Sequence, residues 1–186
     1  METNAGAVVL DASCAINIFA TGRIREIAIA WANRLAISKY VLQREALFVR
    51  QYRPESTGFE KAPLDLTDLI QEGLISVVEL ADSREIATMV ELAASIDDGE
   101  AVTASIAVCR QGSIATDDRK ASSIVRKRFP ETRVISTLDL LSRWACAGSV
   151  EQSELKAAME RMRIGASFIP NRRDTRYGWW SAIVEA

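Results

Sequence analysis

Histidine is absent from this sequence of 186 residues. Without an imidazole the chain cannot perform Ser-His or Cys-His nucleophilic catalysis or general-base catalysis by histidine, and it cannot ligate zinc through histidine. Any hydrolytic chemistry must therefore use carboxylates, hydroxyls, lysine, a thiolate or a metal ion held by oxygen atoms.

Cysteine is scarce. The three cysteines, Cys14, Cys109 and Cys146, are widely spaced and form no Cys-x-x-Cys pair. An odd number without that spacing fits a reducing compartment better than a disulfide framework or a zinc site.

Long apolar runs and an extreme charge are also missing. No segment approaches the roughly 18 apolar residues of a membrane-spanning helix. The first residues, METNAGAVVLDAS, lack the basic and apolar regions of a signal peptide. The net charge of −2 does not mark a nucleic-acid binder, and a composition with 48% hydrophobic residues is ordinary for a globular protein. We expect a cytoplasmic protein that does not interact with membranes.

Strands and helices alternate along most of the chain. Short apolar runs predict four strands, at residues 7–10, 75–80, 113–116 and 133–136. Apolar residues at helical spacing predict helices at 14–21, 23–36, 38–52, 66–74, 83–95, 99–111, 119–129 and 137–148. Residues 53–65 contain prolines and a glycine and predict a loop. This order indicates an α/β domain with a parallel sheet.

We place this domain at residues 1–148 and a helical extension at residues 149–186. Ser149 and Gln152 have the spacing of a capping box at the start of the extension. Trp179 and Trp180 could stack on bases, but tryptophan mostly buries apolar area. We therefore expect them to dock the C-terminal segment onto the domain or onto a partner chain.

The acidic residues that stand out have a structural explanation one by one. Asp11, Asp117 or Asp118 can cap the helix that follows, Asp97 and Glu100 have the spacing of a capping box, and Glu45 can be a solvated helix residue. Together they have a second explanation. Residues that follow parallel strands gather at the carboxyl edge of the sheet, where Asp11, Asp117 and Asp118 are expected.

Clustered carboxylates repel one another, and a hard divalent cation with oxygen ligands relieves that repulsion. Glu100 lies in the first turn of a helix expected to pack on the sheet, with Thr103 one turn further on. The cluster therefore points to a Mg²⁺ or Mn²⁺ site.

Four motifs occur in a meaningful order: VVLDAS, a glutamate within VLQREAL, DDGEAVTASIA and SIATDDRKA. This order resembles the PIN-domain nucleases, the group that includes VapC-type toxins, and in particular the branch whose third motif is GEA. The resemblance covers roughly residues 7 to 140. It implies a three-layer α/β/α fold with a central parallel sheet, to which the chain adds the helical extension.

The resemblance also assigns roles to residues. Asp11 matches the first acid, Glu45 the second, Glu100 the acid of GEA, and Asp117 and Asp118 are joint candidates for the last. All five are candidate catalytic residues, and Asp11, Glu100, Asp117 and Asp118 are the candidate metal ligands. Ser13, Thr103 and Thr116 are expected to support the ligands. In many relatives the third acid stands at the position that Thr103 occupies here.

The function that the resemblance implies is metal-dependent hydrolysis of phosphodiester bonds in RNA, with one or two Mg²⁺ or Mn²⁺ ions. The chain would then be an endoribonuclease and could be the toxin of a toxin–antitoxin pair. Its expected partners are RNA, an antitoxin protein and further copies of itself in a homo-oligomer.

Two groups of basic residues could bind the RNA. The first follows the paired aspartates and comprises Arg119, Lys120, Arg126, Lys127, Arg128 and Arg133; the second comprises Arg161, Arg163, Arg172, Arg173 and Arg176. The alternative is a solvated helix face without a ligand. If these residues contact phosphates, binding should weaken steeply with salt.

Two other functions fit part of the pattern. The first is a PIN-like module that binds nucleic acid or protein without catalysis. The second is a phosphotransfer receiver or a phosphatase with an aspartyl nucleophile. That chemistry requires a second aspartate near Asp11 and a lysine after a late strand, and neither is present in VVLDAS or after RVIS.

Overall fold

The computed structural model describes residues 6–32, 34–45, 47–53 and 58–185, without the side chains of residues 52 and 53. Its centre is a sheet of five parallel strands in the order β5-β2-β1-β6-β7. The strands are β1 (Val8–Leu10), β2 (Leu35–Ser38), β5 (Ile75–Val78), β6 (Ser113–Ala115) and β7 (Arg133–Ile135). Strand β1 is therefore central, with Leu10 paired with Ile37 of β2 and Ala115 of β6.

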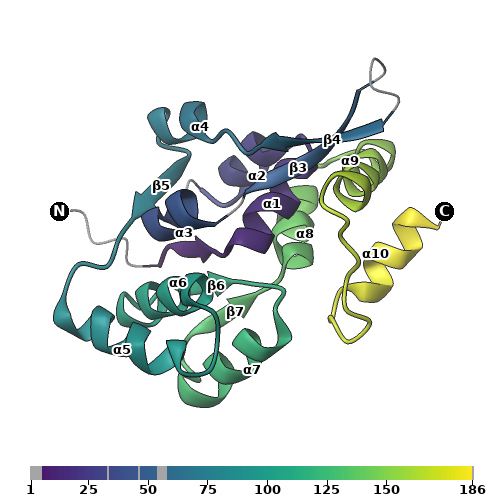
Figure 1. Ribbon diagram of the computed structural model, residues 1–186. Helices are drawn as coiled ribbons and strands as arrows, with labels where there is room; N and C mark the ends of the chain where they lie inside the picture. The colour runs from purple at the N-terminus through teal and green to yellow at the C-terminus, as the bar shows by residue number, and fades with distance from the viewer. Residues whose placement is uncertain (1–5, 33, 46, 54–57, 186) are drawn as a thin grey trace.

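Helices cover both faces of the sheet and give the three-layer α/β/α fold that the resemblance implies (Figure 1). One face carries α1 (Ala12–Ala20), α2 (Ile24–Ala30), α8 (Thr137–Ala147) and α9 (Gln152–Gly165). The other carries α5 (Ser83–Ala93), α6 (Asp98–Cys109) and α7 (Arg119–Arg128). Short helices α3 (Lys39–Arg44) and α4 (Thr67–Gln71) follow β2 and precede β5.

Alternation along the strands divides the apolar core into two layers. Val8 and Leu10 pack among α1, α2, α8 and α9, whereas Val9 packs among α6 and its neighbours. Such strands are buried on both faces and carry apolar side chains without polar interruption. Helix α6 is likewise buried from Ala101 to Ala107, because it lies between the sheet and α5.

The helix predicted at residues 23–36 is wrong. Helix α2 ends at Ala30, and Leu35–Ser38 form β2, a strand that the sequence analysis missed. The chain leaves the helix through Ala32, whose φ of 54° is left-handed. Neither a glycine nor a proline marks this end, and a short apolar run buried on both faces cannot be assigned to a strand by periodicity.

The helix at residues 38–52 and the loop at 53–65 are also wrong. Ser38 does cap a helix, accepting the Val41 N–H at 3.1 Å, but α3 ends at Arg44. Strands β3 (Phe48–Arg53) and β4 (Gly58–Pro63) then form an antiparallel hairpin. The hairpin extends from the body beside α9 (Figure 1), and β3 contacts α1 and α9. Tertiary contacts, rather than the local pattern, therefore select the extended conformation.

The C-terminal segment ends in α10 (Tyr177–Val184), which packs beside α9. Trp180 and Ile183 are buried in the same core cluster as α1 and α8, so the segment docks on this chain's own core. The capping box predicted from Ser149 to Gln152 is wrong. Ser149 has a φ of 46°, and Glu151 occupies the position before the helix.

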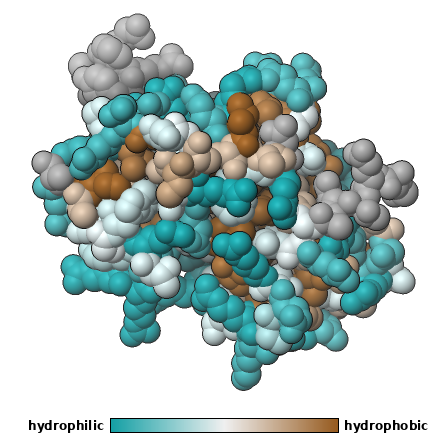
Figure 2. All heavy atoms as spheres, turned by 180° about the vertical axis from the view of Figure 1, so that it is seen from behind, coloured by the Kyte–Doolittle hydropathy of each residue, from teal (hydrophilic) through white to brown (hydrophobic). Residues whose placement is uncertain are grey.

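Several large apolar side chains are exposed at the surface of the described part of the chain. Figure 2 shows patches of apolar residues on one face with hydrophilic residues between them. In the described part of the chain, Ile169 is the most exposed large apolar residue, at 82%. No helix among the described residues has both the length and the apolar character needed to span a bilayer.

Candidate metal centre

Acidic residues follow the two central strands at the carboxyl edge of the sheet. Asp11 comes directly after β1, and Asp117 and Asp118 follow β6 after a single residue, Thr116. The backbone N–H of Asp11 donates to the carbonyl of Ala115 at 3.0 Å, which holds the two strand ends together. Asp11 and the Asp117–Asp118 pair therefore lie at the same edge of the sheet, as their positions after the strands predict.

Asp11 is buried, with 4% of its surface exposed. Its Oδ1 accepts the backbone N–H of Cys14 at 2.6 Å, which makes it the N-cap of α1, and the hydroxyl of Ser13 donates to Oδ1 at 2.9 Å. Burial raises the pKa of Asp11 to about 6, against the lowering effect of hydrogen bonds that include one from Thr116; the charge of Asp117 raises it further.

Asp117 is held by four hydrogen bonds. Oδ1 accepts the backbone N–H of Thr137 at 2.9 Å, and Oδ2 accepts the Thr137 hydroxyl at 2.5 Å, an amide N–H of Asn17 at 3.0 Å and the Cys14 thiol at 3.7 Å. Burial raises the pKa of Asp117 despite these donors. The carboxylate is thus fixed in position beside Asp11.

Asn17 and Thr137 were not predicted from the sequence. Both are buried, and Asn17 also donates to the Thr137 hydroxyl at 3.1 Å. Thr137 could have been found, because it follows β7, the strand next to β6, at the same edge of the sheet. Asn17 gives a weaker signal: it lies one turn after Cys14 on the helix that Asp11 caps.

Asp118 behaves differently from its neighbour. Its side chain is exposed, and Oδ1 accepts the backbone N–H of Ala121 at 2.7 Å as the N-cap of α7. Its negative charge is the largest electrostatic effect on Glu100. Asp118 therefore caps a helix and faces the acidic cluster at the same time.

Glu100 enters the cluster from the first turn of α6. It forms the predicted capping box with Asp97, accepting the Asp97 N–H at 3.3 Å. Partial burial raises the pKa of Glu100 to about 7, and the charges of Asp118 and Asp11 act in the same direction. The hydrogen bond from Asp97 lowers the pKa of Glu100, but burial and the neighbouring charges outweigh it, so the ionised carboxylate remains unfavourable here.

Glu45 reaches the same helix start from another direction. It is the C-cap of α3 rather than a residue in the middle of a helix, and its backbone is extended (φ −87°, ψ 146°). Its carboxylate lies against Gly99, where the Cβ of any other residue would collide with Glu45 Oε1. The fold therefore brings Glu45 against the first turn of α6, where Gly99 provides the space.

Three hydroxyl residues were expected to support the acids. Ser13 and Thr116 do so by hydrogen bonding to Asp11. Thr116 also accepts the N–H of Asp118 at 3.1 Å. Thr103 is fully buried one turn after Glu100, and its Oγ1 has no hydrogen-bond partner among the described residues.

The acids lie within electrostatic reach but not within coordination distance of a common point. In the part of the chain that the structure describes, no three acidic or thiol side chains form a ready-made metal-binding group. Equally, no lysine or arginine among these residues forms an ion pair with any of the five candidate acids. The negative charge is consequently left without a basic partner.

The basic residues divide into those with a partner and those without one. Arg128 pairs with Glu91 at 2.6 Å, Arg163 with Glu160 at 3.0 Å, and Arg176 with Asp139 at 2.6 Å. Arg161 donates to the carbonyl of Thr21 at 2.6 Å. The remaining basic candidates form no ion pair with a described residue; they are Arg119, Lys120, Arg126, Lys127, Arg133, Arg172 and Arg173.

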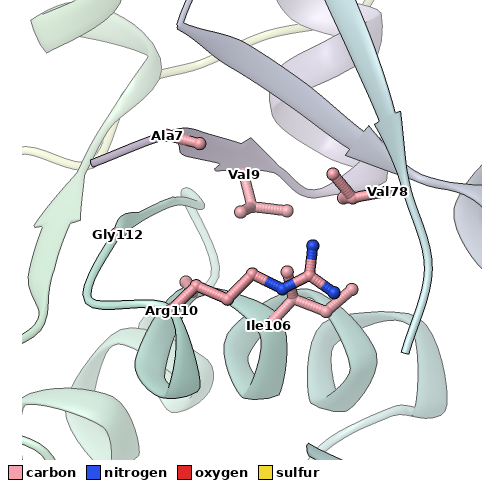
Figure 3. Close-up of a pocket in the computed structure, with 7 residues that line it drawn as sticks. Ala7, Val9, Val78, Ile106, Arg110 and Gly112 are labelled. Atoms are coloured by element: carbon pink, nitrogen blue, oxygen red, sulfur yellow. The ribbon is translucent and has the colours of Figure 1, made fainter. Parts of the chain in front are cut away.

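A hollow elsewhere on the molecule is not a binding site. It lies between β1 and α6 near Ala7 and Gly112, and the side chain of Arg110 extends along its floor (Figure 3). It has no room for a water molecule. The Arg110 guanidinium donates to Glu85 at 2.7 Å, so its charge is used within the fold.

Comparison of the chain with models of known protein families, with curated proteins and with solved structures finds no match. The interpretation of the acidic cluster therefore depends on its own chemistry and on the motif order.

Proposed function

We propose that this chain is a metal-dependent endoribonuclease of the PIN-domain type, which hydrolyses phosphodiester bonds in RNA at the acidic edge of its sheet. One observation carries the proposal. Carboxylates from separate segments meet there, the pKa values of Asp11 and Glu100 are raised to about 6 and 7, and no described basic side chain neutralises them. A bound cation would relieve that repulsion.

The residues present fit a hard divalent ion. The donors are carboxylate oxygens, which Mg²⁺ and Mn²⁺ prefer. Mg²⁺ keeps several waters and needs only one or two direct carboxylates, so acids too far apart to share an ion directly can still act through water. The unpartnered hydroxyl of Thr103 beside Glu100 is a polar group that such a hydrated site could satisfy.

We assign the contacts to the ion, direct or through a bound water, to Asp11, Glu100 and Asp118, with Asp117 as the alternative to Asp118. When bound, the ion would lower the pKa of water and offset charge on the phosphoryl oxygens. Ser13 and the Cys14 N–H keep the Asp11 carboxylate oriented, and Thr137 and Asn17 do the same for Asp117. Glu45, lying over Gly99, would orient the attacking water.

The motif order supports a narrower role, the toxin of a toxin–antitoxin pair. In that role an antitoxin would cover or distort the acidic edge, and a second copy of the chain would complete a dimer. Both partners can be looked for by co-purification.

The test combines metal binding with RNA cleavage. We expect wild type to bind Mn²⁺ or Mg²⁺ in calorimetry and to cut single-stranded RNA only when the ion is present. The Asp11→Asn/Asp118→Asn variant should lose both, with cleavage reduced at least about a hundredfold. The matched control is Asp68→Asn/Glu131→Gln, which removes two exposed carboxylates outside the cluster and should behave as wild type.

A PIN-like binding module without catalysis is the second candidate. The observation in its favour is that Asp11, Glu100 and Asp118 each cap a helix, which accounts for them without a metal. If wild type and the double variant both fail to bind the ion and to cut RNA, this second function replaces the first.

A further inference from the structure

A groove of about 1000 Å³ opens beside the acidic edge. Thr116 and Asp117 are among the residues that line it. One wall is α7, and the opposite wall is the segment Phe168–Thr175 between α9 and α10. In Figure 1 this segment and α7 lie on the same side of the molecule, next to α8. The groove therefore connects Asp117, one of the candidate catalytic residues, with the C-terminal extension.

The charge of the groove is unbalanced toward positive. Arg119, Arg126 and Lys127 on the α7 side and Arg173 on the opposite side line it, and none forms an ion pair with a described residue. Of the acids that line it, Asp139 is neutralised by its ion pair with Arg176 at 2.6 Å. Asp117 and Asp174 accept hydrogen bonds but form no ion pair with a described residue, so four unpaired cations face two unpaired carboxylates.

The C-terminal wall, Phe168–Thr175, is held by packing and by hydrogen bonds. Phe168 and Pro170 are buried, and the N–H of Arg173 donates to Asn171 Oδ1 at 3.0 Å. The Arg176–Asp139 ion pair joins the wall to the start of α8, two residues from Thr137, which holds Asp117. Trp180 anchors the following helix in the core.

Between its two buried neighbours, Ile169 is 82% exposed and lines the groove. An isoleucine exposed to solvent on this wall offers apolar contact to a ligand. Cations on both walls together with this apolar side chain match the backbone and the exposed sugar and base faces of an unpaired polynucleotide. The volume is in the range of small-ligand sites, which suits a few unpaired nucleotides and does not enclose a duplex.

We propose that the C-terminal extension forms half of the substrate site. Single-stranded RNA lies in the groove, with phosphates between Arg126 and Lys127 on α7 and Arg173 on the extension, and with a sugar or base against Ile169. The strand is thereby led to the acids next to Asp117. This inference rests on the proposed ribonuclease function, of which it names the substrate form and the binding surface.

The test measures binding separately from cleavage. A labelled single-stranded RNA of mixed sequence is titrated in EDTA, at several salt concentrations, into wild type and Arg126→Ala/Arg173→Ala, which changes one exposed cation on each wall. We expect the double variant to bind roughly tenfold more weakly, with a salt slope shallower by about 1.4, the value for two lost single-strand phosphate contacts.

Two further variants make the test specific. Arg84→Ala/Lys156→Ala removes two cations outside the groove that have no ion pair among the described residues, and it should bind as wild type. Ile169→Ser should weaken binding without changing the salt slope, since no charge is removed. The residues changed in the groove are exposed, so thermal melting should remain that of wild type.

The outcomes separate this inference from the proposed function. Groove variants that bind and cut RNA as wild type overturn the inference, even if Asp11→Asn/Asp118→Asn abolishes cleavage. Equal affinity for duplex and single strand also overturns it. Weakened binding by the groove variants in a protein that never cuts RNA supports the groove and refutes the nuclease.

Discussion

At the scale of single residues, a carboxylate can be favourable for a helix and unfavourable for the fold at once. Asp11 caps α1 with its Oδ1, yet burial raises its pKa to about 6. The cap needs only an oxygen acceptor, which asparagine also provides. The cap does not require the negative charge, and burial disfavours it, so a bound cation would offset the cost of ionising Asp11.

Asp11→Asn should therefore stabilise the metal-free protein at high pH. The pKa of Asp11 is about 6 in the folded protein and 3.8 without the fold. The protonated Asp11 carboxyl makes its full contribution to the free energy of unfolding below pH 3.8. That contribution is lost as the pH rises through about 6. In EDTA, urea unfolding should show the variant about 3 kcal/mol more stable at pH 8, with almost no difference at pH 3. A constant difference at both pH values would contradict this.

Gly99 is a second residue at which a substitution should change activity without lowering stability. Alanine there should displace the Glu45 carboxylate, the flexible end of a long side chain, at little cost to the fold. Because alanine is favoured over glycine in a helix, stability should stay unchanged or rise by up to about 1 kcal/mol. Metal-dependent cleavage should fall by about tenfold or more, as in Glu45→Gln.

The control for this change is Gly178→Ala in α10, where an added Cβ meets nothing within 4 Å. It should alter neither cleavage nor the pH dependence. Full activity of Gly99→Ala would show that Glu45 has no role in the site.

At the scale of elements, helix starts at the carboxyl edge of the sheet organise the cluster. Helices α1, α6 and α7 begin at Asp11, Asp97 and Asp118, and their first turns direct backbone N–H groups toward the acids. Such positions favour negative charge. The same geometry thus explains why acids occur there and why they are close to one another.

Asp118 allows the cap of α7 to be tested apart from the charge. Asp118→Asn retains an acceptor for the Ala121 N–H, so its unfolding free energy should match wild type, whereas Asp118→Ala should lose about 1 kcal/mol. Cleavage should be lost in both variants, because neither asparagine nor alanine carries the negative charge. If Asp118→Asn cuts RNA normally, the aspartate is a cap only, and Asp117 becomes the ligand to test.

At the scale of the whole molecule, the sheet separates two apolar layers, and the C-terminal extension belongs to one of them. Trp180 and Ile183 share a cluster with Leu138 of α8 and Met159 of α9. The extension therefore contributes to the core as well as to the groove. Its wall is positioned by the same packing that stabilises the fold.

Trp180→Ala should accordingly cost about 3 kcal/mol or more in urea unfolding, because a large buried side chain leaves a cavity. Trp179→Ala should cost less, since Trp179 is only partly buried. RNA binding by a folded Trp180→Ala sample should also weaken, because the wall before α10 loses its anchor. Equal unfolding free energies for both variants would contradict the packing of α10.

The sequence alone determined the α/β class, four of the five strands of the sheet, the caps at Asp11, Ser38 and Asp97, a cap at Asp117 or Asp118, and the chemistry open to a chain without histidine. These follow from local patterns: apolar runs, capping residues and side-chain type. Tertiary structure alone decided that Leu35–Ser38 is a strand and that residues 48–53 leave the helix for a hairpin, because packing on distant segments outweighs local propensity. It also decided how Asp117 is held, why Gly99 faces Glu45, and that the C-terminal segment forms one wall of the groove. Each of these joins residues far apart in the chain, and such contacts leave no periodic trace in the sequence.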